Sequence, residues 1–243
     1  AKHRPDRIDA ALAGSGDTLT LTGRKSMVVD GNAADRLIVT ARHAGELVLL
    51  WVDPRAPGVF VTPQITLDMR DVALAQFDSV ALGADAVLAR GDVAEAALSH
   101  AMIAGRAIVA AEQLGVAQAV ADQTVTYLKT RKQFGIEIGR FQALQHRAAH
   151  LYGELEQTAS LIAAALSAID DGDDTSEALS RAAKAKAART GKRAAEEGVQ
   201  MHGGIGMTDE MDLGFFMKRD RALAEILGDA GCHTEWLLRA KGL

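Results

Sequence analysis

The sequence predicts an α+β protein: an antiparallel β-sandwich or barrel formed by residues 1–91, followed by an antiparallel four-helix bundle formed by residues 92–243. Two observations predict this division. All four prolines lie at or before Pro63, and the 180 residues that follow contain none, which favours helices because proline breaks a helix interior. The apolar residues recur with a period of two in the first part and with a period near 3.6 from about Asp92.

The first part contains short runs of β-branched residues and leucine, one of which alternates strictly between threonine and leucine. Clusters of glycine, serine, asparagine, aspartate and proline separate these runs and are typical of turns. Short strands with turns between them indicate a sandwich or a barrel. The expected strands are residues 18–22, 37–39, 47–52 and 59–61, and the expected turns are residues 14–16, 30–32 and 53–55.

The second part contains four segments with helical periodicity, and short connections between long amphipathic helices favour an antiparallel bundle. The four helices are expected to cover about residues 92–127, 144–169, 175–200 and 219–241. The buried face of the first helix is expected to contain Leu98, Met102, Val109, Val116, Val120 and Tyr127. The buried face of the second helix is expected to contain Leu144, Ala148, Leu151, Leu155, Ile162, Leu166 and Ile169.

The composition argues against several classes of protein. The 27 Lys and Arg residues and 32 Asp and Glu residues give a net charge of −5, which disfavours a general attraction to nucleic acid or to an anionic membrane. The single cysteine, Cys232, excludes an internal disulfide and a cysteine-based zinc site. No segment approaches the roughly 18 apolar residues of a membrane span, and residues 1–4 carry no signal-peptide apolar region. The expected location is therefore cytoplasmic.

Two patterns resemble metal sites, and we interpret both otherwise. The acidic run at residues 170–174 is similar to a calcium loop, but the twelfth position, where an EF-hand needs a carboxylate, holds Arg181 or Ala182. His146 and His150 have the spacing of two zinc ligands on a helix, but the glutamate of the zincin motif is missing between them. The sequence therefore predicts no metal site.

Two segments at the ends of predicted helices carry candidate binding groups. Residues 200–206 contain three glycines and end the third helix. A helix cap is the favoured interpretation, because glycine adopts the left-handed conformation, and bare backbone N–H groups there could also receive an anion. Residues 131–142 connect the first two helices. An arginine beside an exposed turn, flanked by an aromatic ring and an amide, could hold a phosphate.

Four segments, in the right order along the chain, together resemble the acyl-CoA dehydrogenase family. Residues matching its R-x-x-F-G…F-Q signature are Arg131, Phe134, Gly135, Phe141 and Gln142. The three other matches are residues 200–206 with its Q-x-x-G-G-x-G turn, residues 23–31 with its N-G-x-K-x-W-I-T-N-G strand, and residues 67–70 and 77–80 with its L-G-M-R-G-S…F-D-D-V stretch.

The resemblance implies an activity and a cofactor. Members of the family remove a proton alpha to an acyl-CoA thioester and pass the beta hydrogen to FAD as hydride, and electron-transfer flavoprotein is the expected electron acceptor. Each FAD of the family lies across a dimer interface, with one subunit beside the flavin and its neighbour around the pyrophosphate and adenosine. The family's N-terminal helical domain is expected to be absent from this chain. The implied FAD-binding residues on the neighbour's side are Arg131, Phe134, Gly135, Gln142, Gln200, Met201, His202, Gly203 and Gly204.

The flavin side of the family pattern is not preserved in this chain. Met27 and Val29 stand at the tryptophan and threonine positions of W-I-T, so a methyl group replaces a hydroxyl. The usual base of the family is the glutamate of an E-G-T segment, and alignment on the preceding R-D pair places Gly-Asp-Ala there, at residues 228–230. Some members carry the base on the first bundle helix instead, where this chain has Gly105. No catalytic residue is therefore predicted.

Three functions follow from this pattern. The favoured one is a subunit of a heteromeric acyl-CoA dehydrogenase, in a heterotetramer whose homologous partner carries the base and whose substrate is a bulky acyl-CoA, such as one with a steroid side chain. The second is a self-sufficient homomeric dehydrogenase whose base is Asp229, or Glu225 after a local slip of the last helix. It leaves Met27 and Val29 unexplained. The third is a structural relative without FAD or turnover.

Overall fold

The computed structural model describes Arg4 and residues 7–243. The chain divides into two compact units, residues 4–101 and residues 102–243. The division falls within a long helix, α1 (Gly91–Thr130), so that about three turns of α1 belong to the β unit. The domain boundary expected from the sequence, at residue 91, lies at the first residue of this helix.

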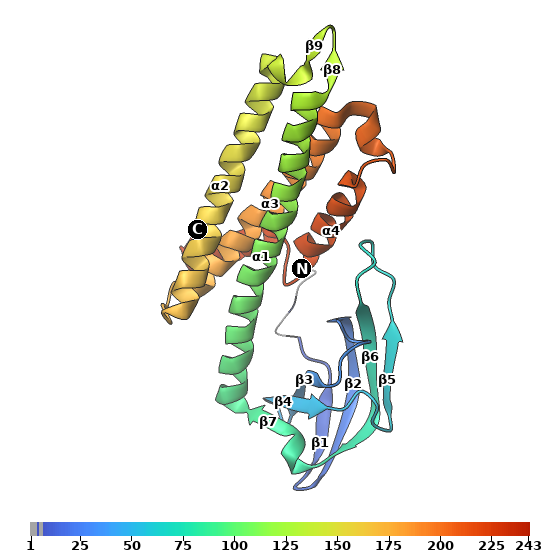
Figure 1. The fold of residues 1–243 in the computed structure, drawn as a ribbon. Coiled ribbons are helices and arrows are strands. Elements are labelled where there is room, and N and C mark those ends of the chain that lie inside the picture. The colour runs from blue at the N-terminus through green and yellow to red at the C-terminus, as the bar shows by residue number, and fades with distance from the viewer. Residues whose placement is uncertain (1–3, 5–6) are drawn as a thin grey trace. The chain divides into compact units, whose positions relative to one another are not determined.

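The β unit is a single sheet of seven strands (Figure 1). The strands are β1 (Ala11–Ser15), β2 (Thr18–Val29), β3 (Leu37–His43), β4 (Glu46–Val52), β5 (Val59–Pro63), β6 (Val72–Leu82) and β7 (Val87–Arg90). Their order across the sheet is β5-β6-β2-β1-β3-β4-β7. All neighbours are antiparallel except β1 and β3, which run parallel and share one pair, Ala11 with Arg42.

The sheet curls around one apolar core. In β2, Leu19 and Leu21 are buried while Thr18 and Thr22 are exposed, as a period of two requires. Strands that are far apart in the sheet order contribute to the same core, so the sheet has the closed character of a sandwich or barrel, and the predicted fold class is confirmed. The core residues are Ala10, Leu12, Leu19, Leu21, Leu37, Val39, Ala41, Val48, Leu50, Val52, Ala75, Phe77 and Val80.

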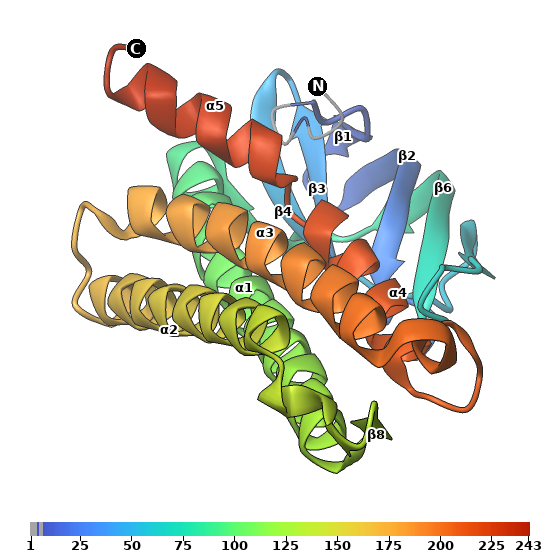
Figure 2. The same ribbon diagram turned by 90° about the horizontal axis from the view of Figure 1, so that it is seen from above.

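The helical unit contains most of α1 and four further helices. These are α2 (Gln142–Asp170), α3 (Ser176–His202), α4 (Leu213–Glu225) and α5 (Ala230–Ala240). α3 packs against α2, α4 and α5 and lies between α2 and the α4–α5 pair (Figure 2). The first three predicted helices are confirmed, and alanine-rich clusters fill the spaces between them.

The prediction of one continuous helix over residues 219–241 is wrong, because the chain breaks between α4 and α5. Leu227 and Gly228 have φ angles of 57° and 108°, which a right-handed helix does not contain. Asp229 then accepts a hydrogen bond from the backbone N–H of Cys232 at 2.7 Å and so caps the start of α5. The apolar periodicity continues across the break and conceals it.

The buried face of α1 is shifted along the sequence by about one residue from the expected face. Of the six expected positions, Val120 is buried and the other five are half-buried. The positions that are buried instead are mostly small or polar, because α1 packs closely against its neighbours. The buried residues of α1 are Ala94, Arg106, Ala107, Ala110, Gln113, Ala117, Val120, Thr124 and Leu128. On α2 the expected face is closer to the observed one, since Leu151, Leu155 and Ile162 are buried.

Within the described residues, α1 is a helix long and apolar enough, by length and composition, to cross a membrane. An 18-residue window of α1 has a mean hydropathy of 1.3, and 22% of that window is buried. The expectation that no segment approaches the apolar length of a membrane span therefore does not hold for this window. The core helices of proteins in water pass the same test, and α1 carries buried polar side chains at Gln113 and Thr124.

Candidate functional site

The segment between α1 and α2 forms a small hairpin at one end of the bundle (Figure 1). It consists of β8 (Lys132–Gln133), β9 (Ile136–Glu137) and a short 3-10 helix, η2 (Ile138–Arg140). Phe134 and Gly135 form the tip, with φ angles of 53° and 82°. Phe134 is 92% exposed, and its ring meets the ring of Phe141 edge-on, with 6.1 Å between the centroids.

Backbone hydrogen bonds hold Arg131 between the end of α1 and the hairpin. Its N–H donates to the carbonyl of Tyr127 at 2.8 Å, and its carbonyl accepts from the N–H of Ile138 at 2.9 Å. Arg131 and Gln142, the first residue of α2, are both exposed. A guanidinium and an amide that face solvent from neighbouring helix ends form a donor set suited to an anion.

The charges of the hairpin are partly paired with one another. Glu137 lies 2.8 Å from Arg140 and 3.8 Å from Lys132. A hydrogen bond from its own backbone N–H, followed by the charge of Arg140, lowers the pKa of the Glu137 carboxyl. In the described part of the chain, no carboxylate forms an ion pair with Arg131. Arg131 therefore keeps its charge available for a ligand.

α3 ends in the glycine turn that the sequence singles out. Gly203 has a φ of 65°, and its N–H donates to the carbonyls of Val199 and Gln200, so the predicted helix cap is confirmed. A 3-10 helix, η3 (Gly203–Met207), follows. A Cβ built on Gly203 or on Gly204 would meet no atom within 4 Å. The backbone of both glycines therefore borders open space, which a ligand can enter.

Met201 and His202 differ from the other predicted residues, because each is only 4% exposed. The ring of His202 stacks on the ring of Tyr127, with 4.4 Å between the centroids and 27° between the planes. Nδ1 of His202 lies 2.7 Å from the carbonyl oxygen of Gly198, so this nitrogen carries the proton and donates. The stacked rings join the end of α1 to the end of α3. They bring the Arg131 segment and the glycine turn to the same end of the bundle (Figure 1).

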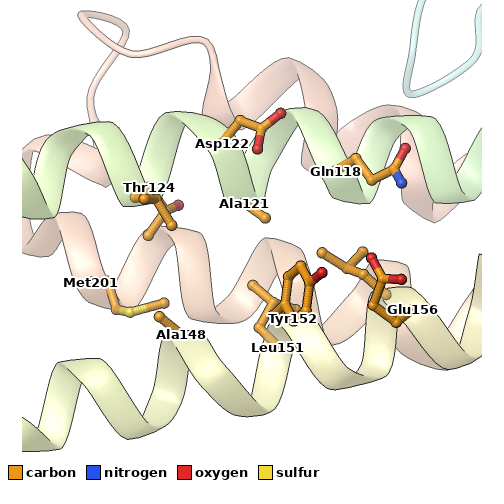
Figure 3. Close-up of a pocket in the computed structure, with 11 residues that line it drawn as sticks. Gln118, Ala121, Asp122, Thr124, Ala148, Leu151, Tyr152, Glu156 and Met201 are labelled. Atoms are coloured by element: carbon orange, nitrogen blue, oxygen red, sulfur yellow. The ribbon is translucent and has the colours of Figure 1, made fainter.

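A pocket of about 400 Å³ lies between α1, α2 and α3, and Figure 3 shows its lining. Alanine, valine, leucine and methionine side chains form much of it, and the carboxylates of Asp122 and Glu156 add charge. Sequence reasoning missed the pocket, because its residues recur with the spacing of any helix face. Of the predicted binding residues, only Met201 lines this pocket. The lining residues are Gln118, Ala121, Asp122, Thr124, Val125, Ala148, Leu151, Tyr152, Leu155, Glu156 and Met201.

The two positions where the resembled family carries its base lie near one another. Gly105, in α1, faces the break between α4 and α5: a Cβ built on it would lie 2.8 Å from Cδ1 of Leu227. Gly228 follows Leu227 directly. The two carboxylates considered as alternatives have structural places, since Asp229 caps α5 and Glu225 is exposed at the end of α4. The Leu227 side chain therefore occupies the space beside Gly105.

A second pocket, of about 490 Å³, lies between α3, α4 and the start of α5 and includes Asp220. Burial raises the pKa of Asp220 to about 6, although a hydrogen bond from Nε2 of Gln113, at 3.0 Å, acts in the opposite direction. Burial lowers the pKa of Lys184 to about 8, against the attraction of Asp220. Nζ of Lys184 donates to the carbonyl of Ala224 at 3.3 Å. No pattern in the sequence distinguishes these buried charges from exposed ones.

Two positions of β2, the strand that resembles the flavin side of the family, present apolar side chains. Met27 and Val29 are 61% and 57% exposed on β2. Neither side chain can donate or accept an ordinary hydrogen bond. In the described residues, His, Cys, Asp and Glu side chains form no group of three that could hold a metal ion.

Comparisons with known proteins agree with this architecture. Residues 93–241 match the family described as acyl-CoA dehydrogenase, C-terminal domain. The acyl-CoA dehydrogenase IpdE2 of Mycolicibacterium smegmatis is 36% identical over 211 residues, which are 86% of this chain and 59% of the relative. The acyl-CoA dehydrogenase FadE34 of Mycobacterium tuberculosis is 36% identical over 137 residues, which are 56% of this chain and 19% of that relative.

Two solved structures share the fold and at least a quarter of the sequence. The ChsE4–ChsE5 complex from Mycobacterium tuberculosis matches with a TM-score of 0.87 and 25% identity, over 98% of this chain and 64% of that chain. A variant of the Tcur3481–Tcur3483 steroid ACAD matches with a TM-score of 0.84 and 29% identity, over 96% of this chain and 63% of that chain. This chain thus spans less than two thirds of each relative's length. Because the family match covers more than half of the chain and agrees with the observed order of sheet and helices, the chain belongs to the acyl-CoA dehydrogenase family.

Proposed function

We propose that this chain is a subunit of a FAD-dependent acyl-CoA dehydrogenase and supplies one half of an interfacial FAD site, while a homologous partner supplies the catalytic glutamate. One observation carries the proposal. Exposed groups suited to an anion, around Arg131 and Gly203, lie at the same end of the bundle, whereas both family base positions, Gly105 and Gly228, are glycine. Such a chain can hold a cofactor and lacks the carboxylate that the reaction needs.

The exposed residues fit the dinucleotide half of FAD. Arg131 offers a planar guanidinium that can bond a phosphate with two parallel N–H groups. The open space beside Gly203 and Gly204 lets a large anion approach the backbone closely. Gln142 offers an amide, and the exposed ring of Phe134 offers a stacking surface. These groups bind and orient the dinucleotide, and none of them is placed to move a proton.

The reaction needs an oxidant and a base. FAD, which members of the family typically bind, would supply the oxidant that accepts the β hydrogen of the acyl-CoA thioester as hydride. On this chain, Asp229 is committed to capping α5, and Leu227 fills the space beside Gly105. Met27 and Val29 offer no polar group on the flavin-side strand. The carboxylate that removes the α proton is therefore expected from the partner.

The relatives support a heteromeric assembly and a bulky substrate. One solved relative is described as a complex of ChsE4 with ChsE5, and the other is described as a steroid ACAD. On this likeness we extend the proposal to a heterotetramer that acts on a steroid-side-chain or other lipid acyl-CoA. A cytoplasmic location and electron-transfer flavoprotein as the electron acceptor complete the proposal.

Flavin stoichiometry tests the proposal. The chain is purified alone and after co-expression with a glutamate-bearing member of the family, and flavin absorbance is compared with protein concentration. We expect flavin only in the co-expressed complex, with about half as many flavins as chains. Arg131→Ala should release that flavin. Arg140→Ala, which removes the hairpin arginine that pairs with Glu137, should retain it.

Each other outcome overturns the proposal in a different direction. One flavin on every chain purified alone would indicate a self-sufficient homomeric enzyme and would direct the search for a base to Asp229 and Glu225. Flavin in neither preparation would indicate a structural relative without turnover. Flavin that is retained by Arg131→Ala would place the cofactor away from the hairpin.

A further inference from the structure

Two aromatic rings lie between the segments proposed to hold the cofactor. Tyr127 is one turn before Arg131, whose N–H donates to the Tyr127 carbonyl at 2.8 Å. His202 is the last residue of α3 and directly precedes Gly203. The rings of Tyr127 and His202 stack with 4.4 Å between their centroids. Tyr127 is therefore close in the chain to Arg131, and His202 is close in the chain to Gly203. The two rings themselves face one another.

The His202 ring is held inside the bundle. It is 4% exposed, and Nδ1 donates to the carbonyl of Gly198 at 2.7 Å. Within the part of the chain that the structure describes, Nε2 has no hydrogen-bond partner. A buried polar atom without a partner costs free energy, so an apolar ring would fill this space at a lower cost. The His202 ring lies against Tyr127, and the residue directly precedes the glycine turn. This position indicates that the histidine helps to place the turn.

Small residues let α1, α3 and η3 meet at the ring pair. A Cβ built on Gly198 would lie 2.5 Å from Cγ1 of Val120, so a larger residue would push α3 away from α1. A Cβ built on Gly206 would lie 3.0 Å from the Cβ of His202, so η3 folds back against the same histidine. The end of α1, the end of α3 and η3 thus come together around the two stacked rings.

We propose that Tyr127 and His202 are positioning residues of the cofactor site. Their stacked rings set the separation between the Arg131 segment and the Gly203–Gly204 turn, and neither side chain touches the cofactor. This inference rests on the function proposed above and deepens it. The histidine of the glycine turn acts from the interior, through the backbone that follows it, whereas Arg131 acts directly on the ligand.

Hydrogen–deuterium exchange on the isolated full chain tests the positioning without any cofactor. Tyr127→Leu and His202→Leu remove one ring each, Tyr127→Phe keeps the stack, and Tyr152→Leu makes the same change at an exposed tyrosine of α2. We expect amides in residues 132–138 and 203–208 to exchange about tenfold faster in both leucine variants of the pair. Tyr127→Phe and Tyr152→Leu should leave both segments unchanged. Acceleration in one segment alone, in neither, or equally along the whole chain overturns the proposal.

Cofactor selectivity in the co-expressed complex gives an independent readout. FAD carries the adenosine half that these segments are proposed to hold, and FMN lacks it. Tyr127→Leu should weaken FAD binding about tenfold, leave FMN binding within about twofold, and be rescued by Tyr127→Phe. Equal loss of FAD and FMN, or no loss of either, overturns the positioning role.

The two proposals fail in distinguishable ways. Release of flavin by Arg131→Ala together with full retention by Tyr127→Leu would contradict the positioning role alone. Retention by Arg131→Ala would contradict the proposed function itself, whatever the exchange rates show.

Discussion

At the scale of single residues, Lys184 and Asp220 are buried side chains of opposite charge in the helical unit, and the cost of burying them exceeds the attraction between them. Lys184 and Asp220 are 0% and 5% exposed. Their mutual attraction leaves the pKa of Lys184 lowered to about 8 and that of Asp220 raised to about 6. Gly191 makes room for the carboxylate, since a Cβ there would lie 1.9 Å from Oδ1 of Asp220. Both charges therefore cost stability at neutral pH, because the cost of burial exceeds the attraction between them.

Lys184→Met should abolish a rise in stability above pH 8. Between about pH 8 and 10.5, the unfolded chain holds a proton on Lys184 that the folded chain has released, so the free energy of unfolding rises with pH by on the order of 3 kcal/mol. Methionine carries no proton, so its curve should lack this rise. Denaturant unfolding at several pH values between about 7 and 10 measures both curves.

The matched control is Lys192→Met, which replaces an exposed lysine of the same helix. Its curve should keep the rise. A rise that persists in Lys184→Met would assign the pH dependence to another group. Asp220 acts in a separate window: because its pKa is raised, the folded chain takes up its proton first, and stability increases as the pH falls from about 6 to 4.

At the scale of elements, glycines in the bundle helices have opposite roles. Gly198 lies where α3 crosses α1, and a Cβ there would lie 2.5 Å from Val120. Gly115, in α1, has no atom within 4 Å of a built Cβ. The first glycine permits a close approach of two helices. The second contributes only the conformational freedom that weakens a helix interior.

Gly198→Ala and Gly115→Ala should therefore change stability in opposite directions. Overpacking at the crossing should cost Gly198→Ala about 1–3 kcal/mol. Gly115→Ala should stabilise the protein by about 0.5–1 kcal/mol, because alanine loses less conformational freedom in a helix. Thermal unfolding of both variants beside the parent chain is the measurement. A shift of both melting temperatures in the same direction would show that the crossing tolerates a methyl group.

At the scale of the whole molecule, each unit has its own apolar core. The β core uses residues from β1 to β6 and the segment just before β1, and the helical clusters use α1, α2 and α3. Because the helical clusters lie entirely after residue 101, the β unit is not needed to complete them. The helical unit thus contains its own apolar core, and we expect it to fold by itself.

A shortened chain of residues 92–243 should fold without the β unit. We expect a helical circular-dichroism spectrum, a single cooperative thermal transition, and amide exchange in residues 203–208 as slow as in the full chain. This variant also tests the domain boundary expected from the sequence. A helical spectrum that melts gradually would show that the bundle depends on contacts outside these residues.

Local sequence patterns were enough to predict four of the seven strands of the sheet, the first three helices and the cap at the end of α3. The four expected strands and the first three helices occur because proline, turn residues and apolar periodicity act on neighbouring residues of the chain. The cap at Gly203 could be predicted for the same reason, since glycine adopts a left-handed φ without the strain of a Cβ. The roles of Arg131 and Gln142 were inferred from a family motif and stay predictions, although the structure places both at the surface.

Three features depend on contacts between residues far apart in the chain, and spacing carries no information about them. The break between α4 and α5 places Leu227 against Gly105 of α1. The packed face of α1 follows its close crossing with α3, so small and polar residues are buried in place of larger apolar ones. His202 is buried because Tyr127 covers its ring. Periodicity shows that a helix has an apolar face, but close packing determines which atoms that face meets.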